Sequence, residues 1–203
     1  MSDSPHEALR ADPDIGPLVE THGELTLDPA SDLFERLVIS ILRQQVSMAS
    51  AAATRERLFD AVTVTPAGIS DADNDLLRDA GLSRQKTRYV NEVADAFLEH
   101  GYSIESFEDA ADEEIHEELT AITGVGDWTA NMQLLFAFGR EDVFPVGDLG
   151  IRKGFEAVVG DGYSRAEMRE YAERWAPYRS YASLYLWRVE EDIAESVEEV
   201  ESA

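Results

Sequence analysis

Residues 119–130 read LTAITGVGDWTA, and this stretch decides the fold. Apolar residues at helical spacing stand on both sides of its centre, with Ile115 and Leu119 before it and Trp128 and Met132 after it. Between these two faces, two glycines one residue apart make a very tight turn. The stretch therefore predicts two consecutive helices joined by a Gly-Val-Gly turn.

The start of the second helix in this hairpin is suited to a phosphate. Its first N–H groups, from Asp127 to Thr129, have no partner within the helix, and the positive end of the helix dipole lies beside them. The missing side chains of Gly124 and Gly126 let another backbone come close. Taken alone, however, a Gly-x-Gly sequence is more typical of an ordinary hairpin whose glycines only close two helices.

The rest of the chain also shows helical spacing, and the alternating apolar runs typical of strands are absent. We therefore predict an all-α protein of about eight to eleven helices. The predicted helix starts lie near Ser31, Ser70, Ser83, Asp112, Asp127, Asp148, Ser164 and Ser180. Ser70–Asp73 and Ser164–Glu167 have the pattern of capping boxes. Only the first thirty residues and the acidic segment Glu190–Glu201 are expected to be loosely held.

The composition excludes several classes of protein. No cysteine occurs among the 203 residues, which excludes disulfides, thiolate zinc sites, iron–sulfur clusters and cysteine nucleophiles. The four histidines stand far apart without ligand spacing, so a histidine metal site is not expected. The opening residues lack a basic start, and no segment approaches about 18 consecutive apolar residues. We therefore expect a cytoplasmic protein without a membrane partner.

The net charge of −25 is extreme for this length. Asp and Glu number 42 against 17 Lys and Arg, and only Lys86 and Lys153 are lysines. Excess acid with arginine in place of lysine resembles the surfaces of proteins from salt-loving cells, where self-repulsion is screened over about 3 Å at 1 M salt. The alternative is an acidic protein made for a basic partner, but the acids are spread over several predicted helices. On charge alone, nucleic acid would be a poor guess for the partner.

Three further motifs, taken together with the hairpin, indicate a family. Val143–Asp148 reads VFPVGD, and its aspartate stands 22 residues after Gly126. Ile41–Ser47 reads ILRQQVS, and Arg174–Tyr181 reads RWAPYRSY. In this order and spacing, the motifs resemble those of the helix-hairpin-helix DNA glycosylase superfamily typified by endonuclease III. The last motif is similar to the closing helices of the 3-methyladenine DNA glycosylase II branch.

The resemblance implies an all-α, two-lobed helix-hairpin-helix glycosylase fold. Residues 31–140 would form the lobe that contains the hairpin, and residues 1–30 together with 141–203 would form the second lobe. The active-site cleft would lie between these lobes. Proteins of this family flip a damaged base out of duplex DNA and hydrolyse its N-glycosidic bond.

Asp148 is the catalytic residue that the resemblance implies. Its position directly before Leu149–Arg152 is also that of a helix cap, and the two roles are compatible. An N-alkylated purine carries a positive charge, so its glycosidic bond breaks toward an oxocarbenium ion without a strong general acid. One fixed carboxylate beside the sugar stabilises that cation and orients or deprotonates the attacking water.

Trp128 decides between two subclasses of the family. Relatives that also cut the abasic strand carry a lysine at this position, because Schiff-base chemistry requires an amine. The tryptophan therefore implies a monofunctional enzyme that leaves an abasic site. The resemblance assigns the base pocket to Trp128, Trp187, Met132 and Leu149. Met132 and Leu149 stand where other members can carry aromatic residues, and isolated tryptophans are more often core residues.

The resemblance assigns DNA contacts to two segments. Gln45 would fill the space left by the flipped nucleotide, although a glutamine in a loop can also be an ordinary polar side chain. The hairpin residues expected to hold a phosphate are Gly124, Val125, Gly126, Asp127 and Thr129. The backbone carbonyls expected to bind a sodium or potassium ion are those of Thr120, Ile122 and Val125. No other cofactor and no iron–sulfur cluster is expected.

Together the motifs predict a monomeric, monofunctional DNA glycosylase of base excision repair. It would act on damaged double-stranded DNA and hydrolyse the N-glycosidic bond of alkylated purines such as 3-methyladenine. One alternative is a glycosylase for uracil, a mismatched thymine or an oxidised purine. The other is a non-catalytic helix-hairpin-helix module that only binds DNA. Asp148 and the loop before it argue against that module, because binding does not require the carboxylate.

Overall fold

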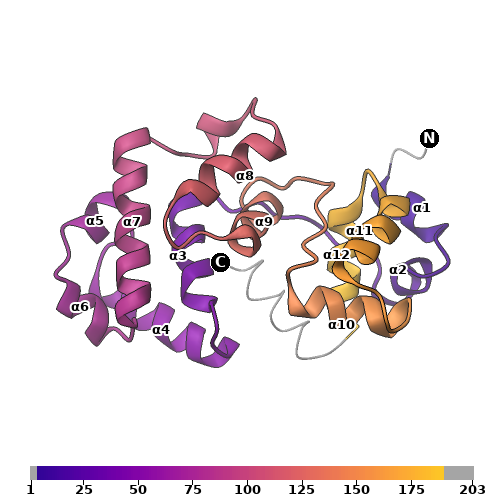
Figure 1. The fold of residues 1–203 in the computed structure, drawn as a ribbon, viewed down its shortest axis with the longest axis horizontal. Helices are drawn as coiled ribbons and strands as arrows, with labels where there is room; N and C mark the ends of the chain where they lie inside the picture. The colour runs from indigo at the N-terminus through magenta and orange to yellow at the C-terminus, as the bar shows by residue number, and fades with distance from the viewer. Residues whose placement is uncertain (1–3, 190–203) are drawn as a thin grey trace. The chain divides into compact units, whose positions relative to one another are not determined.

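The computed structural model describes residues 4–189 (Figure 1), so the predicted acidic segment Glu190–Glu201 lies outside the described residues. Within residues 4–189 the chain is helical and contains no strand, which confirms the predicted all-α fold. The chain divides into a terminal unit, Met1–Pro29 with Leu134–Ala203, and a middle unit, Ala30–Gln133. Over the described residues, no helix has both the length and the apolar character needed to span a membrane.

The middle unit is built around the buried helix α3. Its helices are α3 (Leu33–Arg43), α4 (Met48–Ala61), α5 (Pro66–Ser70), α6 (Asn74–Asp79), α7 (Arg84–His100) and α8 (Asp112–Ala121), with a 3-10 turn at Glu105–Phe107 and the start of α9 (Asp127–Phe136). Every residue of α3 from Leu33 to Leu42 except Glu35 is buried. Helix α7 packs against α3 and α5, and the rings of Phe34 and Phe97 meet edge-on with centroids 5.2 Å apart. A largely apolar helix thus forms the core that the other helices cover.

Polar side chains fix the starts of these helices. Ser83 Oγ accepts the Lys86 N–H at 3.2 Å at the start of α7, and Gly101 ends this helix with φ 69°, in the left-handed region. At the start of α3, the Asp32 carboxylate accepts the Glu35 N–H at 2.8 Å. Each cap satisfies an N–H group that the helix itself leaves without a partner. Local sequence signals therefore set these boundaries.

One predicted helix start is wrong. Ser70 does not begin a helix but ends α5, which Thr65 caps and Pro66 begins. Helix α6 begins only after Asp73, whose carboxylate accepts the Asp75 N–H at 2.8 Å. A capping hydroxyl followed by proline is a strong start signal, because the proline φ is already set for the first helical turn. The signal at Thr65 and Pro66 therefore starts α5 several residues before Ser70, where the capping pattern predicts a helix start.

The terminal unit has an aromatic core. Its helices are α1 (Pro5–Arg10), α2 (Gly16–His22), α10 (Leu149–Val158), α11 (Arg165–Ala172) and α12 (Arg179–Trp187), with a 3-10 turn at Glu173–Trp175. Phe155, Trp175 and Tyr185 are almost completely buried. The predicted capping box of α11 is confirmed, because Ser164 Oγ accepts the Glu167 N–H at 3.3 Å and the Glu167 carboxylate accepts the Ser164 N–H at 2.7 Å.

The first thirty residues contain two helices, which corrects the prediction that this segment is loosely held. Leu9, Ile15 and Val19 are each at most 2% exposed. Helices α1 and α2 both contact α12, and the Tyr185 hydroxyl donates to the Gly23 carbonyl at 2.7 Å. Prolines stand in the first turn of both helices, where the missing N–H costs nothing. Residues 4–189 therefore contain twelve α-helices, more than the predicted number.

Two glycines let α10 and α12 approach closely in the terminal unit (Figure 1). A Cβ atom added at Gly154 would lie 2.8 Å from the carbonyl carbon of Leu186, and closer still to its oxygen. One turn earlier, a Cβ atom added at Gly150 would lie 2.8 Å from Cδ1 of Trp187. Real Cβ atoms do not make contacts this short. The close approach therefore depends on glycine, and it brings the end of α12 against the start of α10.

Gly154→Ala should lower the free energy of unfolding by about 1–3 kcal/mol, because the added methyl group forces apart two helices in close contact. Urea unfolding of the whole chain measures this change. Gly147→Ala is the matched control, because a Cβ atom there meets no atom within 4 Å. The control should stay within about 0.5 kcal/mol of the wild type. Equal unfolding free energies for the two variants would contradict the close contact of α10 with α12.

Candidate functional site

The predicted hairpin is present between α8 and α9. The Val125 N–H donates to the Ile122 carbonyl at 3.0 Å, and α9 begins soon after this turn at Asp127. Gly124 has φ 99°, in the left-handed region, and a Cβ atom there would lie 2.6 Å from Cβ of Tyr89. The turn thus rests on the Tyr89 side chain of α7. Glycine is the residue that satisfies both the backbone conformation and the close contact at position 124.

Gly126 stands in a different environment from Gly124. A Cβ atom added at Gly126 would meet no atom within 4 Å, and the residue is exposed. Packing inside the protein therefore does not require glycine at this position. The missing side chain leaves open space beside the first N–H groups of α9, the part of a helix that favours an anion.

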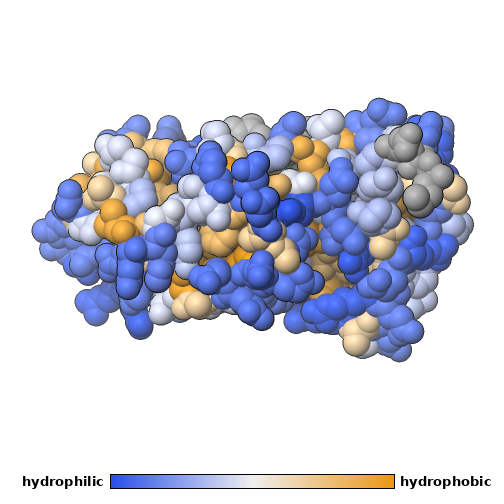
Figure 2. All heavy atoms as spheres, turned by 90° about the horizontal axis from the view of Figure 1, so that it is seen from above, coloured by the Kyte–Doolittle hydropathy of each residue, from blue (hydrophilic) through white to orange (hydrophobic). Residues whose placement is uncertain are grey.

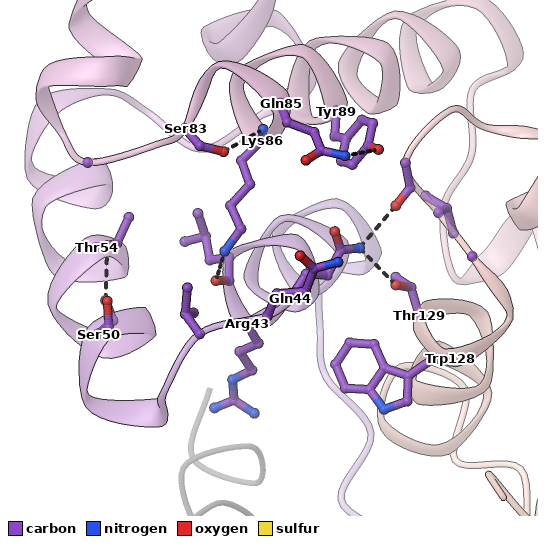
Figure 3. A pocket seen from close by; sticks show the side chains of 17 residues that line it. Arg43, Gln44, Ser50, Thr54, Ser83, Gln85, Lys86, Tyr89, Trp128 and Thr129 are labelled. Carbon is purple, nitrogen blue, oxygen red and sulfur yellow. Dashed lines mark hydrogen bonds between the residues drawn. The ribbon is translucent and has the colours of Figure 1, made fainter. Parts of the chain in front are cut away.

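A pocket of about 730 Å³ lies at this hairpin (Figure 3). Its lining comes from four parts of the middle unit, namely the end of α3 with the turn after it, α4, the start of α7, and the hairpin with the start of α9. None of the 17 lining residues is Asp or Glu, although the chain contains 42 of them. Arg43 and Lys86 supply two positive charges. The pocket is therefore a local exception in a strongly acidic chain whose visible face in Figure 2 is mostly hydrophilic.

The first turns of three helices contribute to this lining. Ser50 stands in the first turn of α4, Gln85 in that of α7 and Trp128 in that of α9. The first turn of a helix carries the positive end of the helix dipole. These partial charges add to the charges of Arg43 and Lys86. The electrostatic environment of the pocket therefore favours a negatively charged ligand.

The structure brings six of the predicted site residues to this pocket. They are Gln45, Gly124, Val125, Gly126, Trp128 and Thr129. Two predicted residues of the same helix α9 do not line it. The Asp127 carboxylate lies 2.9 Å from Nε2 of His116, and Met132 is buried with 6% of its surface exposed. Four of the five residues assigned to phosphate binding, all except Asp127, therefore share one pocket with Gln45, the residue assigned to probing the duplex.

Three hydrogen bonds at the pocket, made by two side chains, had no signal in the sequence. Gln44 Nε2 donates to the Gly124 carbonyl at 3.0 Å and to Thr129 Oγ1 at 3.2 Å. Lys86 Nζ donates to the Leu42 carbonyl at the end of α3 at 2.5 Å, and burial lowers the pKa of this lysine. The partners lie 44 to 85 residues apart in the chain, so no local pattern reports them.

Asp148, the predicted catalytic residue, caps α10 in the terminal unit. Its Oδ1 atom accepts the Ile151 N–H at 3.0 Å and the indole N–H of Trp187 at 2.9 Å. Gly150 leaves room for the second bond, since a Cβ atom there would lie 3.0 Å from the indole nitrogen and 3.1 Å from the same Oδ1. Two donors from different helices thus fix the direction of this carboxylate.

Arg152 holds the loop that carries Asp148. Its guanidinium donates to the carbonyls of Val146, Gly147 and Asp148 over distances of 2.7 to 3.2 Å. The Asp148 N–H in turn donates to the Pro145 carbonyl at 2.8 Å. Backbone and side chain of Asp148 are therefore both held in place by the protein itself. A carboxylate fixed in this way needs no reorganisation when charge develops beside it.

The other two predicted base-pocket residues lie next to Asp148. Trp187 is 6% exposed, and its ring packs against Phe136 with centroids 5.7 Å apart. Leu149, the first residue of α10, is 59% exposed. The structure thus gives Trp187 a contact that the sequence did not predict, the hydrogen bond that orients Asp148. Leu149 offers an apolar surface to solvent directly beside the carboxylate.

The carbonyl groups predicted to bind a monovalent cation lie at the end of α8 and in the hairpin turn. The Ile122 carbonyl accepts one hydrogen bond, from Val125, which leaves it one lone pair. Carbonyl oxygens are ligands that hard cations take, so the donor set of Thr120, Ile122 and Val125 fits such an ion. Elsewhere among the described residues, no group of three or more His, Asp or Glu side chains is placed to hold a metal ion.

The sequence and fold were compared with those of known proteins. Residues 38–177 match the family described as HhH-GPD superfamily base excision DNA repair protein. A putative DNA-3-methyladenine glycosylase of Bacillus subtilis is 29% identical over 185 residues, which are 86% of this chain and 64% of that protein. The chain therefore belongs to the HhH-GPD superfamily of base excision DNA repair proteins, as the motifs predict. It spans slightly less than two thirds of the length of the Bacillus subtilis relative.

Two solved structures share the fold over nearly the whole chain. The Schizosaccharomyces pombe 3-methyladenine DNA glycosylase in complex with abasic DNA has a TM-score of 0.83 at 28% identity, covering 93% of this chain and 98% of that one. The DNA-3-methyladenine glycosidase from Bacillus halodurans has a TM-score of 0.80 at 32% identity, covering 98% of this chain and 94% of that one. The fold described above is therefore that of a helix-hairpin-helix glycosylase.

The two hairpin glycines should differ sharply when each is replaced by alanine. Gly124→Ala should lower the free energy of unfolding by about 1–3 kcal/mol, because alanine is strained at φ 99° and its methyl group meets Tyr89. Gly126→Ala should leave stability within about 0.5 kcal/mol, because no atom lies in its way. Urea unfolding measures both variants, and a loss at Gly126 as large as that at Gly124 would contradict the open environment of Gly126.

Proposed function

We propose that this protein is a monofunctional DNA glycosylase that removes alkylated purines, of the 3-methyladenine type, from damaged double-stranded DNA. The observation that carries the proposal is the Asp148 carboxylate, held by the Ile151 and Trp187 N–H groups at the start of α10. Membership of a base excision repair family supports it. The relatives described above also support the proposal, because they are named as 3-methyladenine glycosylases.

One carboxylate is sufficient for this reaction. The alkylated purine is already cationic, so the bond from its ring nitrogen to C1′ breaks with the electron pair leaving on the purine, which becomes neutral. The fixed Asp148 anion stabilises the oxocarbenium ion that remains. A water molecule then forms the new bond to C1′ and gives its proton to the carboxylate. The products are the free base and an abasic sugar.

Trp128 supports hydrolysis without strand cleavage. A lyase step needs an amine that forms a Schiff base with the sugar. The indole of Trp128 cannot do so, and its ring instead offers an aromatic face to a cationic base. In the proposal, contacts with the flipped base are assigned to Trp128 and Met132 of the middle unit and to Trp187 and Leu149 of the terminal unit. The exposed surface of Leu149 and the partly exposed ring of Trp128 are the parts available for such contact.

The pocket in the middle unit supports DNA binding despite the net charge of −25. In the proposal, one backbone phosphate binds at Gly124–Thr129, where Gly126 leaves open space. The carbonyls of Thr120, Ile122 and Val125 would hold a sodium or potassium ion, whose positive charge would favour an anion at the hairpin. A crystal structure with DNA that shows neither phosphate nor ion at the hairpin would contradict this assignment. We further propose that the protein acts as a monomer in the cytoplasm.

Base release from methylated duplex DNA tests the proposed activity. The wild type should release 3-methyladenine or 7-methylguanine, identified by mass, and should leave intact abasic strands that break only on later treatment with alkali. Asp148→Asn should lower the release rate by at least about 100-fold, because the fixed charge and the proton acceptor are lost. Its affinity for duplex DNA should stay close to that of the wild type.

Other outcomes of this experiment point to other functions. Release of uracil, thymine or an oxidised purine, but of no alkylated base, would contradict the proposed substrate. Binding to duplex DNA without release of any base would favour a non-catalytic module. Release by the Asp148→Asn variant at the wild-type rate would remove Asp148 from the mechanism.

Salt should raise the activity rather than lower it. At about 0.1 M salt the acidic surface repels DNA over about 10 Å, whereas at about 1 M this distance falls to about 3 Å. The few basic groups at the pocket imply few phosphate contacts, and therefore a weak loss of affinity with salt. Base release at about 1 M potassium chloride should exceed that at about 0.1 M. A steady fall in rate from low salt upward would contradict this account of the charge.

A further inference from the structure

We propose that Gln44 is a positioning residue that keeps the turn carrying Gln45 in a fixed position relative to the hairpin. The inference rests on the proposed function, because it concerns how the protein probes a damaged duplex. Gln44 itself need not touch the reacting atoms. Its side chain joins two segments of the middle unit that are assigned different contacts with the same DNA.

The Gln44 amide uses both of its N–H groups on the hairpin. One donates to the Gly124 carbonyl at 3.0 Å, before the Val125–Gly126 step, and the other to Thr129 Oγ1 at 3.2 Å, in the first turn of α9. Figure 3 draws both hydrogen bonds of the Gln44 amide as dashed lines, one of them to Thr129. The side chain therefore holds the proposed phosphate loop from both ends. No other side chain type of this length offers two donors with this geometry and no charge.

Both acceptors are themselves fixed. Gly124 rests on the Tyr89 ring, so its carbonyl cannot shift without moving α7. Thr129 is 2% exposed and begins the buried part of α9. The Tyr89 hydroxyl in turn accepts an N–H of Gln85 at 2.6 Å. The hairpin thus offers Gln44 a rigid frame rather than a mobile loop.

The turn on the other side of Gln44 is also held. The Gln44 N–H donates to the Ile41 carbonyl at 3.2 Å and ends α3, while Lys86 Nζ holds the Leu42 carbonyl at 2.5 Å. The next residue, Gln45, has φ 58°, in the left-handed region that residues with a side chain rarely adopt. Such a conformation persists only where the surroundings fix it. Here the contacts of Gln44 and Lys86 hold the residues directly before Gln45, whose side chain is exposed.

The fixed position of the Gln45 turn affects how the protein recognises DNA with a flipped nucleotide. A duplex held at the hairpin phosphate site meets Gln45 at a fixed distance along its backbone, because Gln44 links the two. Without the two hydrogen bonds, the hairpin can still bind a phosphate, but the probing turn is free to leave its strained conformation. We therefore expect that removing these hydrogen bonds weakens the preference for damaged over intact DNA and leaves the general affinity for DNA nearly unchanged.

Affinity for two duplexes tests this inference, one intact and one containing a stable abasic-site analogue. Gln44→Met keeps the length of the side chain but removes both donors. Its affinity for the intact duplex should stay within about twofold of the wild type, while its preference for the abasic duplex should fall about tenfold, the change expected for lost hydrogen bonds of ordinary strength. The unfolding midpoint of each variant in urea serves as the control for folding.

Substitutions at the acceptor give an independent readout. Thr129→Val removes one acceptor and should lower the preference for the abasic duplex by less than Gln44→Met does. Thr129→Ser keeps the hydroxyl and should therefore keep this preference. The double variant Gln44→Met with Thr129→Val should be no worse than Gln44→Met alone, because both remove the same bond. Additive losses would mean that the two residues act separately, and would overturn the inference.

Other results would also decide whether Gln44 is a positioning residue. An unchanged preference in Gln44→Met would overturn the positioning role. An equal fall in both affinities together with a lower unfolding midpoint would reduce Gln44 to a structural residue. The base-release assay separates this test from the proposed function, because the two duplex affinities are measured with DNA that is not hydrolysed. A wild type that prefers the abasic duplex but releases no base contradicts only the proposed activity, whereas one with no preference contradicts both.

Discussion

The hydrogen bond from the Trp187 indole to the Asp148 carboxylate is the contact on which the proposed catalytic site depends. It exists because α12 lies close against α10, and that closeness exists because Gly150 and Gly154 have no side chains. The same carboxylate oxygen also caps α10, so one atom serves the helix start and the contact with α12. A residue fixed by the fold in this way can stabilise positive charge without first having to turn toward it. Stability and chemistry here share the same few atoms.

The second constraint is electrostatic. In the proposed function, a chain with net charge −25 binds a polyanion, and a pocket lined by no Asp or Glu would allow this without an overall basic charge. Arg43, Lys86 and the first turns of three helices provide the positive field there. Backbone N–H groups supply part of this field at no cost in net charge.

Much of the fold was readable from the sequence, because its signals are local. The hairpin, the Ser83 and Ser164 caps and the cap at Asp148 all depend on residues within four positions of one another. The bonds of Gln44 and of Trp187 were not readable, because their partners lie 80, 85 and 39 residues away and meet only after the helices have packed. The helices within the first thirty residues were missed for a related reason. Their proline-rich sequence looks irregular until burial against α12 stabilises it.

The most direct test of the central claim is the crystal structure of this protein with duplex DNA that contains a stable abasic-sugar analogue. We expect the Asp148 carboxylate about 3–3.5 Å from C1′ of that sugar, still bonded to the Trp187 indole, a distance at which it can stabilise the cation and receive a proton from water. We also expect a backbone phosphate on the N–H groups that follow Gly126. A sugar bound elsewhere, with Asp148 turned away and no phosphate at the hairpin, would contradict the account.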